Sequence, residues 1–306
     1  MELNKSAHSI LQTDGLTKQY GSFTALDHVS LNLNQGEIYG LIGRNGAGKT
    51  TFFKCVMGLV KPTGGTIAID GEASQLNRAR RKMGFMINPS FFPYLNPKES
   101  LNYLCGIKGI GSKAETDKLL KIVELDGVKK PFKEFSLGMK QRLGIAGALL
   151  GFPSVVMLDE PINGLDPQGI IDIRNIIKNV HAQTGTTFII SSHILSELDL
   201  IATQFGFIDQ GVLLKEISHS KLHEHTKKLL VIEVDDGLKA QSTLHAAGID
   251  SISLEGNRLS LETHLDTSNE VARILIGSGT EVYDLHRQEN TLEDYFMSLV
   301  GGRDNA

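Results

Sequence analysis

The sequence predicts an α/β protein of two domains: a larger one with a mixed sheet, a P-loop and a helical subdomain, and then a small α+β domain. Three observations support this class. Residues 10–217 alternate short apolar runs with helical patterns, which is typical of a sheet of parallel strands covered by helices. A glycine-rich segment, residues 43–51, follows one such run and opens a helix. The alternation stops at residues 218–228, where polarity rises and we expect a linker.

Composition limits the class of protein. A chain of 306 residues is long for one hydrophobic core, and 31 basic against 35 acidic residues give a net charge of −4. This charge offers no footprint for DNA or RNA, so no nucleic acid partner is expected. Cys55 and Cys105 form no Cys-x-x-Cys pair, which argues against disulfides and zinc and fits a reducing cytosol. We expect neither secretion nor a membrane span, because the longest charge-free run, residues 143–158, contains Gly151 and Pro153.

The larger domain is expected after an N-terminal tail, residues 1–9. Three runs that are apolar on both faces are predicted to be buried strands, at residues 37–43, 154–160 and 186–193. A mostly helical insert, residues 89–152, separates the first run from the second. Its helices are expected at residues 113–125, where Leu119, Leu120 and Val123 share one stripe, and at residues 137–150.

The second domain is expected at residues 229–306. Its pattern predicts a strand, a helix, a hairpin that turns at Gly256-Asn257, a second helix and a strand, at residues 229–234, 239–247, 251–263, 270–276 and 281–286. A last helix is predicted with Thr291 as its cap. Its apolar stripe is interpreted as core packing and consists of Leu292, Tyr295, Phe296 and Leu299.

The glycine-rich segment reads GRNGAGKTT and has the spacing of a phosphate-binding P-loop between a strand and a helix. Its glycines let backbone N–H groups wrap phosphate oxygens, Lys49 reaches the terminal phosphates, and Thr50 can ligate Mg²⁺. A glycine-rich turn without function is the competing interpretation, and strand, spacing, Lys and Thr together argue against it. The expected nucleotide-binding residues are Gly43, Asn45, Gly46, Ala47, Gly48, Lys49, Thr50 and Thr51.

Two further strand ends carry candidate catalytic residues. Asp159 and Glu160 end a buried strand, where ligands of open α/β sheets collect. Asp159 suits Mg²⁺ held through water, and Glu160 suits a base that orients an attacking water. His193 ends the third strand and is able to donate to a phosphate if that strand neighbours the other two.

The helix at residues 137–150 opens in an unusual way. Ser136, Leu137 and Gly138 bury little and leave backbone N–H groups bare. A helix start with bare amides and a Ser cap is typical of an anion site. The sequence therefore predicts a second place where an anion approaches this chain.

These motifs, taken in order, resemble the ATP-binding subunits of ABC transporters over residues 10–217. "SLGMKQ", from Ser136, is similar to the signature loop, "NGLDP" with Asp166 to the dimer loop, and His193 to the switch histidine of that family. Tyr20 matches the aromatic residue that stacks on adenine, although an ordinary strand-end aromatic remains a rival interpretation.

The resemblance implies a mechanism and partners. In this family the signature helix of one subunit points its Ser and Gly backbone at the γ-phosphate held by the P-loop of a second subunit. It therefore implies an Mg²⁺-dependent ATPase, with ATP and Mg²⁺ as cofactors, that pairs with a second ATP-binding subunit, most simply a copy of itself. It also implies a polytopic membrane permease as partner, with this chain in the cytoplasm on the inner face of the cell membrane.

Three local features refine the resemblance. "FSLGMKQRLGIAGALL", "SSHILSELDLIA" and "NTLEDYF" are similar to the branch that exports peptide antibiotics, as in bacitracin resistance and lantibiotic immunity. Phe91, Phe92 and Tyr94 stand where the family receives a helix of its permease, although clustered aromatics more often form a core. Asn88 stands where the family has Gln, a side chain that reaches Mg²⁺ and the attacking water. An ordinary turn role before Pro89 is the alternative.

Two other functions compete with the transporter subunit. One is an ABC-type ATPase that acts on ribosomes, DNA or cofactor assembly; the other is a regulatory module without turnover. The single P-loop argues against the fused ribosomal type, and the lack of long coiled coils between the motifs argues against the DNA-repair type. The regulatory module predicts that the base is missing, whereas Glu160 is present.

Overall fold

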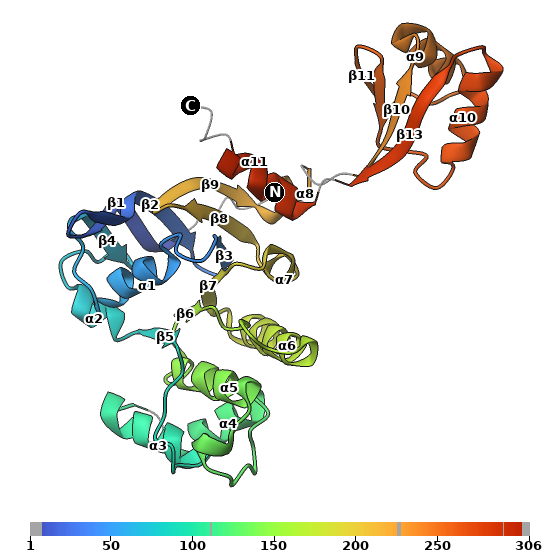
Figure 1. Cartoon of the computed structure of the whole chain (residues 1–306). Helices are drawn as coiled ribbons and strands as arrows, with labels where there is room; N and C mark the ends of the chain where they lie inside the picture. The colour runs from blue at the N-terminus through green and yellow to red at the C-terminus, as the bar shows by residue number, and fades with distance from the viewer. Residues whose placement is uncertain (1–7, 111, 225–227, 290, 302–306) are drawn as a thin grey trace, which may run out of the picture. The chain divides into compact units, whose positions relative to one another are not determined.

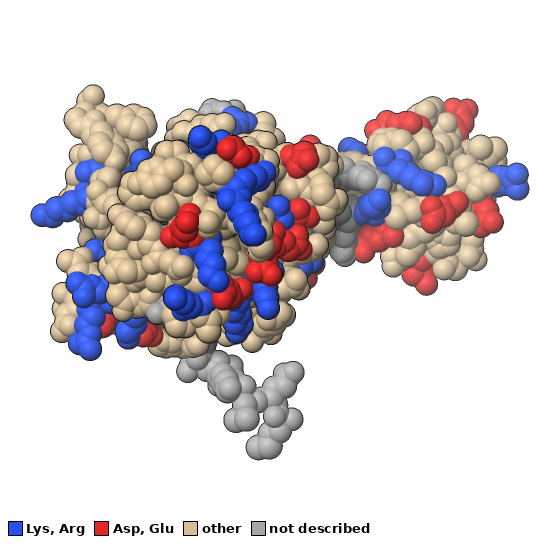
Figure 2. Space-filling model, turned by 90° about the horizontal axis from the view of Figure 1, so that it is seen from below, with Lys and Arg blue, Asp and Glu red and all other residues tan. Residues whose placement is uncertain are grey.

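The computed structural model describes residues 8–110, 112–224, 228–289 and 291–301 of the chain (Figure 1). Two compact units form, Met1–His219 and Ser220–Ala306. No helix in the described ranges is both long enough and apolar enough to span a bilayer. On the face of each unit that Figure 2 shows, basic and acidic side chains are interspersed, as the small net charge leads one to expect.

The larger unit contains two sheets. The first is antiparallel, in the order β2-β1-β4, with β1 (Ser9–Tyr20), β2 (Phe23–Asn34) and β4 (Gly64–Ile69). The second has the order β5-β6-β7-β3-β8-β9, and only its edge strand β9 runs antiparallel. Its strands are β3 (Ile38–Ile42), β5 (Met83–Ile87), β6 (Val155–Asp159), β7 (Thr187–Ser192), β8 (Gln204–Asp209) and β9 (Val212–Ser218).

The three predicted buried strands are confirmed as β3, β6 and β7, neighbours in one parallel ladder and buried along almost their whole length. The sequence predicted one mixed sheet. It did not predict that β1, β2 and β4 form a separate antiparallel sheet, or that β9 is the antiparallel edge of the other sheet. Strand β1 begins at Ser9, the last residue of the expected tail, and residues 1–7 lie outside the described residues. One core joins both sheets to the helix that follows the P-loop.

Two helices of the insert start at recognisable caps. A capping box of Asn96 and Glu99, with Pro97 in the first turn, opens α3, and the Ser112 hydroxyl caps α4. In α4 the stripe residues Leu119 and Leu120 are buried as predicted. The helices are α1 (Lys49–Met57), α2 (Leu76–Arg80), α3 (Pro97–Lys108), α4 (Lys113–Ile122), the 3₁₀ turn η1 (Phe132–Glu134), α5 (Leu137–Ala148), α6 (Pro167–Thr184) and α7 (Leu195–Asp199).

The helical insert leaves the parallel sheet after β5 and returns to it before β6. In it α3, α4 and α5 pack on one another, and α5 also packs along β5 (Figure 1). Gly84 and Gly144 make this last contact close, because a Cβ at Gly84 would lie 2.0 Å from the carbonyl oxygen of Ala148 and one at Gly144 2.6 Å from the Met86 sulfur. The C-terminal half of α5 is therefore held close against β5, the strand that leads to Asn88.

The second unit has the order strand, helix, strand, strand, helix, strand, with an antiparallel sheet β11-β12-β10-β13. This is the ferredoxin-like arrangement. The hairpin turns at Gly256-Asn257 as expected, with Glu255 opposite Arg258. The elements are β10 (Lys228–Val234), α9 (Gly237–Ala246), β11 (Ile252–Glu255), β12 (Arg258–Leu261), α10 (Ser268–Gly277), β13 (Val282–Glu289) and α11 (Leu292–Gly301).

Two expectations about this part of the chain need correction. Within residues 218–228, where a linker was expected, His219–Glu224 form helix α8, and residues 225–227 lie outside the described residues. Thr291 does cap the last helix, since its hydroxyl accepts from the Asp294 N–H at 3.1 Å. Yet no residue of α11 is fully buried, so the stripe that includes Leu292 and Phe296 is half-buried rather than part of a core.

Candidate functional site

The strand order brings the predicted residues to one edge of the parallel sheet. Asp159 lies opposite Ile87 on one side and Ser191 on the other, and Ile42 lies opposite Ser192. The segments that follow these strand ends are Asn88, Glu160, His193 and the P-loop, in neighbouring positions. This is the carboxyl edge of an open α/β sheet, where ligands bind.

The P-loop begins after β3 and ends at helix α1. Gly48 is the N-cap of α1 in a left-handed conformation, φ 109°, and no side chain caps this helix start. A Cβ at Gly48 would lie 2.7 Å from the Ala25 carbonyl oxygen, so only glycine fits. The free N–H groups at the start of α1 and the positive end of its dipole face a cavity of about 280 Å³, which is a ready-made anion site.

Lys49 is the first residue of α1 and is only 5% exposed. Its ammonium donates to the carbonyl oxygens of Gly43 at 2.5 Å and Arg44 at 3.2 Å, and lies 3.1 Å from Glu160 Oε1. A buried charge needs such partners. The amine is therefore held at the mouth of the P-loop, beside the carboxylate that follows β6.

Asp159 is held by two hydroxyl groups. Thr50 Oγ1 donates to Asp159 Oδ2 at 2.7 Å, and Ser191 Oγ donates to Asp159 Oδ1 at 2.6 Å. The same Ser191 hydroxyl accepts from the Glu160 N–H at 2.9 Å. The Thr50 hydroxyl and the Asp159 carboxylate are hard oxygen donors next to a phosphate-binding loop, so this pair fits Mg²⁺.

Glu160 takes a left-handed backbone conformation, φ 48°, which is rare for a residue other than glycine and is typical of functional sites. Its carboxylate lies between two nitrogen donors. Oε1 is 3.1 Å from the Lys49 ammonium and Oε2 is 2.9 Å from His193 Nδ1. The structure therefore brings Lys49, Glu160 and His193, the three predicted catalytic residues, into one connected group.

A second cluster lies on the helical insert and at the start of α6. Ser136 caps α5 by accepting from the Met139 N–H at 3.3 Å, and Asp166 caps α6 by accepting from the Gly169 N–H at 3.0 Å. Ser136, Gly138 and Asp166 together line an open hollow of about 310 Å³. None of these three residues lines the P-loop cavity. The predicted site is thus divided into two places on one chain.

The aromatic contact at the P-loop differs from the expectation. Tyr20 and Phe23 lie opposite each other across the turn of the β1–β2 hairpin. Phe23, 63% exposed, lines the P-loop cavity together with Ala25 and Arg44, whereas Tyr20 does not, and Lys18 lies over its ring at 4.8 Å. The analysis of the sequence missed Phe23 and Ser191. The signal for Phe23 was its place just after a Gly-Ser turn. The signal for Ser191 was a hydroxyl at the end of the third strand.

Asn88 follows β5 directly and is therefore next to the end of β6, but its side chain does not join the group. It is exposed, takes a left-handed conformation with φ 51°, and makes no side-chain hydrogen bond within the described ranges. Asn is among the residues that tolerate this conformation best. This backbone geometry suits the turn interpretation of Asn88.

Comparison with known proteins gives consistent similarities. The profile of the ABC transporter family matches residues 26–163. The bacitracin transport ATP-binding protein BcrA of Bacillus licheniformis is 40% identical over 96% of this chain and 98% of its own length. The lantibiotic transport ATP-binding protein SrtF of Streptococcus pyogenes is 42% identical over 68% of this chain and 90% of its own length.

Solved structures agree with the sequence comparison. The dimeric bacterial ABC transporter cassette MJ0796 superposes with a TM-score of 0.63 at 25% identity, over 68% of this chain and 98% of the cassette. A second structure of the same protein is a post-hydrolysis dimer bound to ADP and Pi, with a TM-score of 0.62. The similarity to BcrA includes residues beyond the part of the chain that the cassettes cover.

Proposed function

This chain belongs to the ATP-binding subunits of ABC transporters, and from that membership we propose a specific activity: two copies hydrolyse ATP with Mg²⁺ and drive a membrane permease that exports a peptide antibiotic or similar amphiphile. ATP binding and hydrolysis coupled to transport are properties of the family. The proposed additions are the metal, the pairing of identical copies, the residue roles, the docking face and the cargo.

The observation that carries the residue roles is the connected group Lys49–Glu160–His193 beside Thr50–Asp159. Phosphoryl transfer depends on positioning and on stabilisation of charge. Lys49 and the backbone N–H groups of the P-loop bind the terminal phosphates. Glu160 orients the attacking water and accepts its proton, while His193 holds the Glu160 carboxylate and donates toward the γ-phosphate.

Thr50 and Asp159 are the proposed ligands of Mg²⁺. Thr50 would hold Mg²⁺ and Asp159 would hold it through water, and the bound ion would supply positive charge that offsets the charge of the phosphate oxygens. Ser191 keeps the Asp159 carboxylate in its orientation, because its hydroxyl links Asp159 to the Glu160 N–H. Asn88 would reach the site only after its loop moves.

Pairing of two copies follows from the division of the site. Ser136, Gly138 and Asp166 line a hollow of their own, away from the P-loop cavity of the same chain. A second copy turned by a two-fold axis brings this hollow to the P-loop of the first. Each ATP is then enclosed by residues of both copies, and hydrolysis opens the pair.

The docking face for the permease is proposed on the loop before α3. Phe92 and Tyr94 are 40% and 68% exposed, and Phe92 stacks edge-on against Tyr103 of α3 at 5.0 Å. Phe91 instead packs inward on Phe132 at 5.3 Å. Phe92 and Tyr103 border a largely apolar hollow of about 270 Å³, a shape suited to an apolar helix of the permease, and Tyr94 packs on Phe92 beside it at 5.6 Å. The chain then lies on the inner face of the membrane.

The proposed cargo class is inferred from the relatives alone. BcrA is named for bacitracin transport and SrtF for lantibiotic transport, and we infer a peptide antibiotic or similar amphiphile as the cargo here. The similarity to BcrA covers the C-terminal unit as well as the ATPase unit, which supports a shared cargo class.

The test measures ATP turnover, oligomeric state and membrane binding of the full chain. Mg²⁺-dependent turnover is expected for the unmodified chain, and Lys49→Ala is expected to weaken ATP binding by about 10- to 100-fold, because one charged hydrogen-bonding group is lost. The double variant Phe92→Ala/Tyr94→Ala should keep its turnover but no longer pull a polytopic protein from detergent-solubilised membranes. Turnover without Mg²⁺, or unchanged capture by the double variant, contradicts the corresponding part of the proposal.

A further inference from the structure

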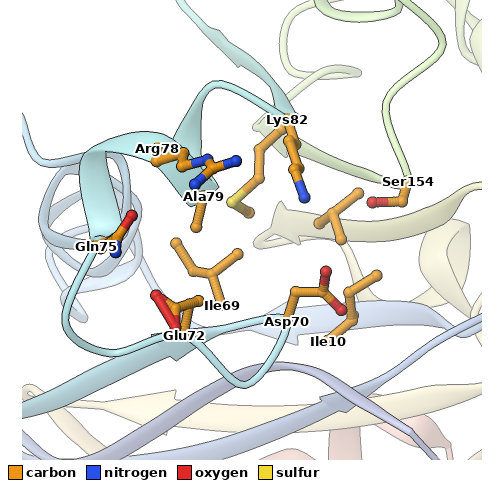
Figure 3. A pocket seen from close by; sticks show the side chains of 11 residues that line it. Ile10, Ile69, Asp70, Glu72, Gln75, Arg78, Ala79, Lys82 and Ser154 are labelled. Atoms are coloured by element: carbon orange, nitrogen blue, oxygen red, sulfur yellow. The ribbon is translucent and has the colours of Figure 1, made fainter.

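A separate cavity lies at the opposite edge of the parallel sheet. It has a volume of about 190 Å³, and its walls come from β1, the end of β4, α2 and the starts of β5 and β6 (Figure 3). Met83 and Val155 are the first residues of β5 and β6, whose other ends lead to Asn88 and Glu160. No P-loop residue lines this cavity, so an inference about it does not depend on the function proposed above.

The floor of the cavity is apolar and buried. Its residues are each at most 6% exposed: Ile10, Ile69, Ala79, Met83 and Val155. At about 30 Å³ per water molecule, the cavity has room for about six waters, which is the bulk of one small organic molecule. An apolar floor of this kind favours an aliphatic group over those waters.

The rim carries charges of both signs on separate walls. Arg78 and Lys82 come from α2 and the turn after it, and Ser154 stands beside them with its hydroxyl toward the cavity (Figure 3). Asp70 and Glu72 come from the turn after β4 and lie on the facing wall (Figure 3). The cavity thus has a basic wall, an acidic wall and an apolar floor between them.

The two walls do not neutralise each other. Within the part of the chain that the structure describes, neither Arg78 nor Lys82 forms an ion pair, and both residues are exposed, so their charged groups are open to a ligand. Asp70 is bound from outside the cavity, by His8 Nε2 at 2.8 Å. A ligand with one charge would therefore satisfy one wall and face a like charge on the other.

We propose that this cavity binds a small zwitterion with an aliphatic body, of the class of a free aliphatic α-amino acid. Its carboxylate lies against Arg78, Lys82 and the Ser154 hydroxyl, where charged donors converge. Its ammonium group lies against Asp70 and Glu72. Its side chain covers the apolar floor, and the balanced charges of the rim select a ligand that carries both charges.

The test uses three probes that share one aliphatic body: L-leucine, 4-methylpentanoate, which lacks the ammonium, and 3-methylbutylamine, which lacks the carboxylate. Calorimetric titration of the full chain should show that leucine binds about tenfold or more tightly than either analogue, because each analogue loses a charge-assisted hydrogen bond. Equal binding of the three probes, or no binding of leucine, overturns the proposal.

Two double variants, one in the basic wall and one in the acidic wall, test which wall binds the carboxylate of the ligand and which binds its ammonium group. In Arg78→Gln/Lys82→Gln, leucine should bind no better than 3-methylbutylamine, because the carboxylate has lost its partners. In Asp70→Asn/Glu72→Gln, leucine should bind no better than 4-methylpentanoate. Arg81→Gln is the matched control, since Arg81 caps the end of α2 without lining the cavity. A loss of leucine binding in Arg81→Gln as large as in the double variants contradicts the assignment, and melting temperature and ATP turnover confirm that every variant is folded.

Discussion

The cluster around the P-loop and the cluster around Ser136 lie on the same unit and differ in how their polar groups are satisfied. Around the P-loop, side chains hold one another: Thr50 and Ser191 bond Asp159, and Lys49 and His193 flank Glu160. In the second cluster, the side chains of Ser136 and Asp166 instead cap the helices to which they belong. The first cluster is organised within one chain, and the second presents exposed donors to another molecule.

The difference shows that one fold can order the catalytic half of a site, around the P-loop, and leave the other half, around Ser136, exposed for a partner. A rigid connected group lowers the reorganisation needed for catalysis. An open hollow, by contrast, makes activity depend on the arrival of a partner. Variants in the two clusters should therefore differ in kind: changes near the P-loop alter the chemistry within one chain, and changes near Ser136 alter only the paired state.

The largest effect is expected for Glu160→Gln. The amide keeps the size of the side chain but no longer accepts the proton of the attacking water, so turnover should fall by a factor on the order of 10² to 10⁴. ATP should still bind, and an ATP-bound dimer should accumulate in size-exclusion chromatography with light scattering. Glu197→Gln is the control, because Glu197 pairs with Arg174 and belongs to neither cluster. Normal turnover of Glu160→Gln would show that another group is the base.

Gly138→Ala tests the open cluster. A Cβ at this position meets only the Leu165 side chain, at 3.9 Å, so the isolated chain has room for it. The methyl group should instead obstruct the partner, and turnover should fall by about tenfold or more, as for overpacking worth 1–3 kcal/mol. Melting temperature and ATP binding by the single chain should stay the same or improve slightly, since Ala favours a helix.

The matched control for this variant is Gly106→Ala in α3, a helical glycine with nothing within 4 Å of the added Cβ. It should leave turnover unchanged. If Gly138→Ala retains full turnover and still forms the ATP-dependent dimer, the hollow around Ser136 is not part of a shared site, and the comparison between the two clusters fails.

Much of the first cluster was predictable, because its signals are local in the sequence. The P-loop glycines, Lys49 and Thr50 lie within eight positions of one another, and Asp159 and Glu160 end an apolar run. Ser191 was not identified, because its role depends on β7 lying next to β6, and strand order is not written in either segment. The left-handed backbone of Glu160 was equally hidden, since Glu has no preference for that conformation.

The fold shows the same division between local and long-range information. The buried parallel strands and the C-terminal hairpin follow from apolar runs and a Gly-Asn turn. The antiparallel sheet joins β4 to β1, which is distant in sequence, and no local pattern indicates that pairing. The stripe on α11 was misread because periodicity shows that one face of a helix is apolar, but not how deeply that face is buried.

A smaller effect separates the two aromatic residues near the P-loop. Stacking of one base on an aromatic ring is worth about 1–3 kcal/mol, so Phe23→Ala should raise the KM for ATP by about tenfold. Tyr20→Ala should change it little, because Tyr20 does not line the cavity and Lys18 lies over its ring. Steady-state kinetics with ATP decide between them. The reverse result, a large effect of Tyr20→Ala and a small effect of Phe23→Ala, would assign the base to Tyr20.

The smallest effect is expected at Asn88, which lies beside the organised cluster without joining it. Gln is one methylene longer, and a contact with the attacking water is worth about 0.5–1.5 kcal/mol, so Asn88→Gln should raise turnover of the isolated chain by about two- to tenfold. The same change should lower the melting temperature slightly, because Gln tolerates the left-handed backbone at φ 51° less well than Asn.

Asn88→Gly separates these two contributions. Glycine relaxes the left-handed turn and removes the side chain, so the melting temperature should be kept while turnover does not rise. Together the two variants show whether Asn88 serves the turn, the site or both. A lower melting temperature of Asn88→Gln with unchanged turnover would mean that Asn88 serves the turn alone. The cluster around the P-loop would then be complete without the loop after β5.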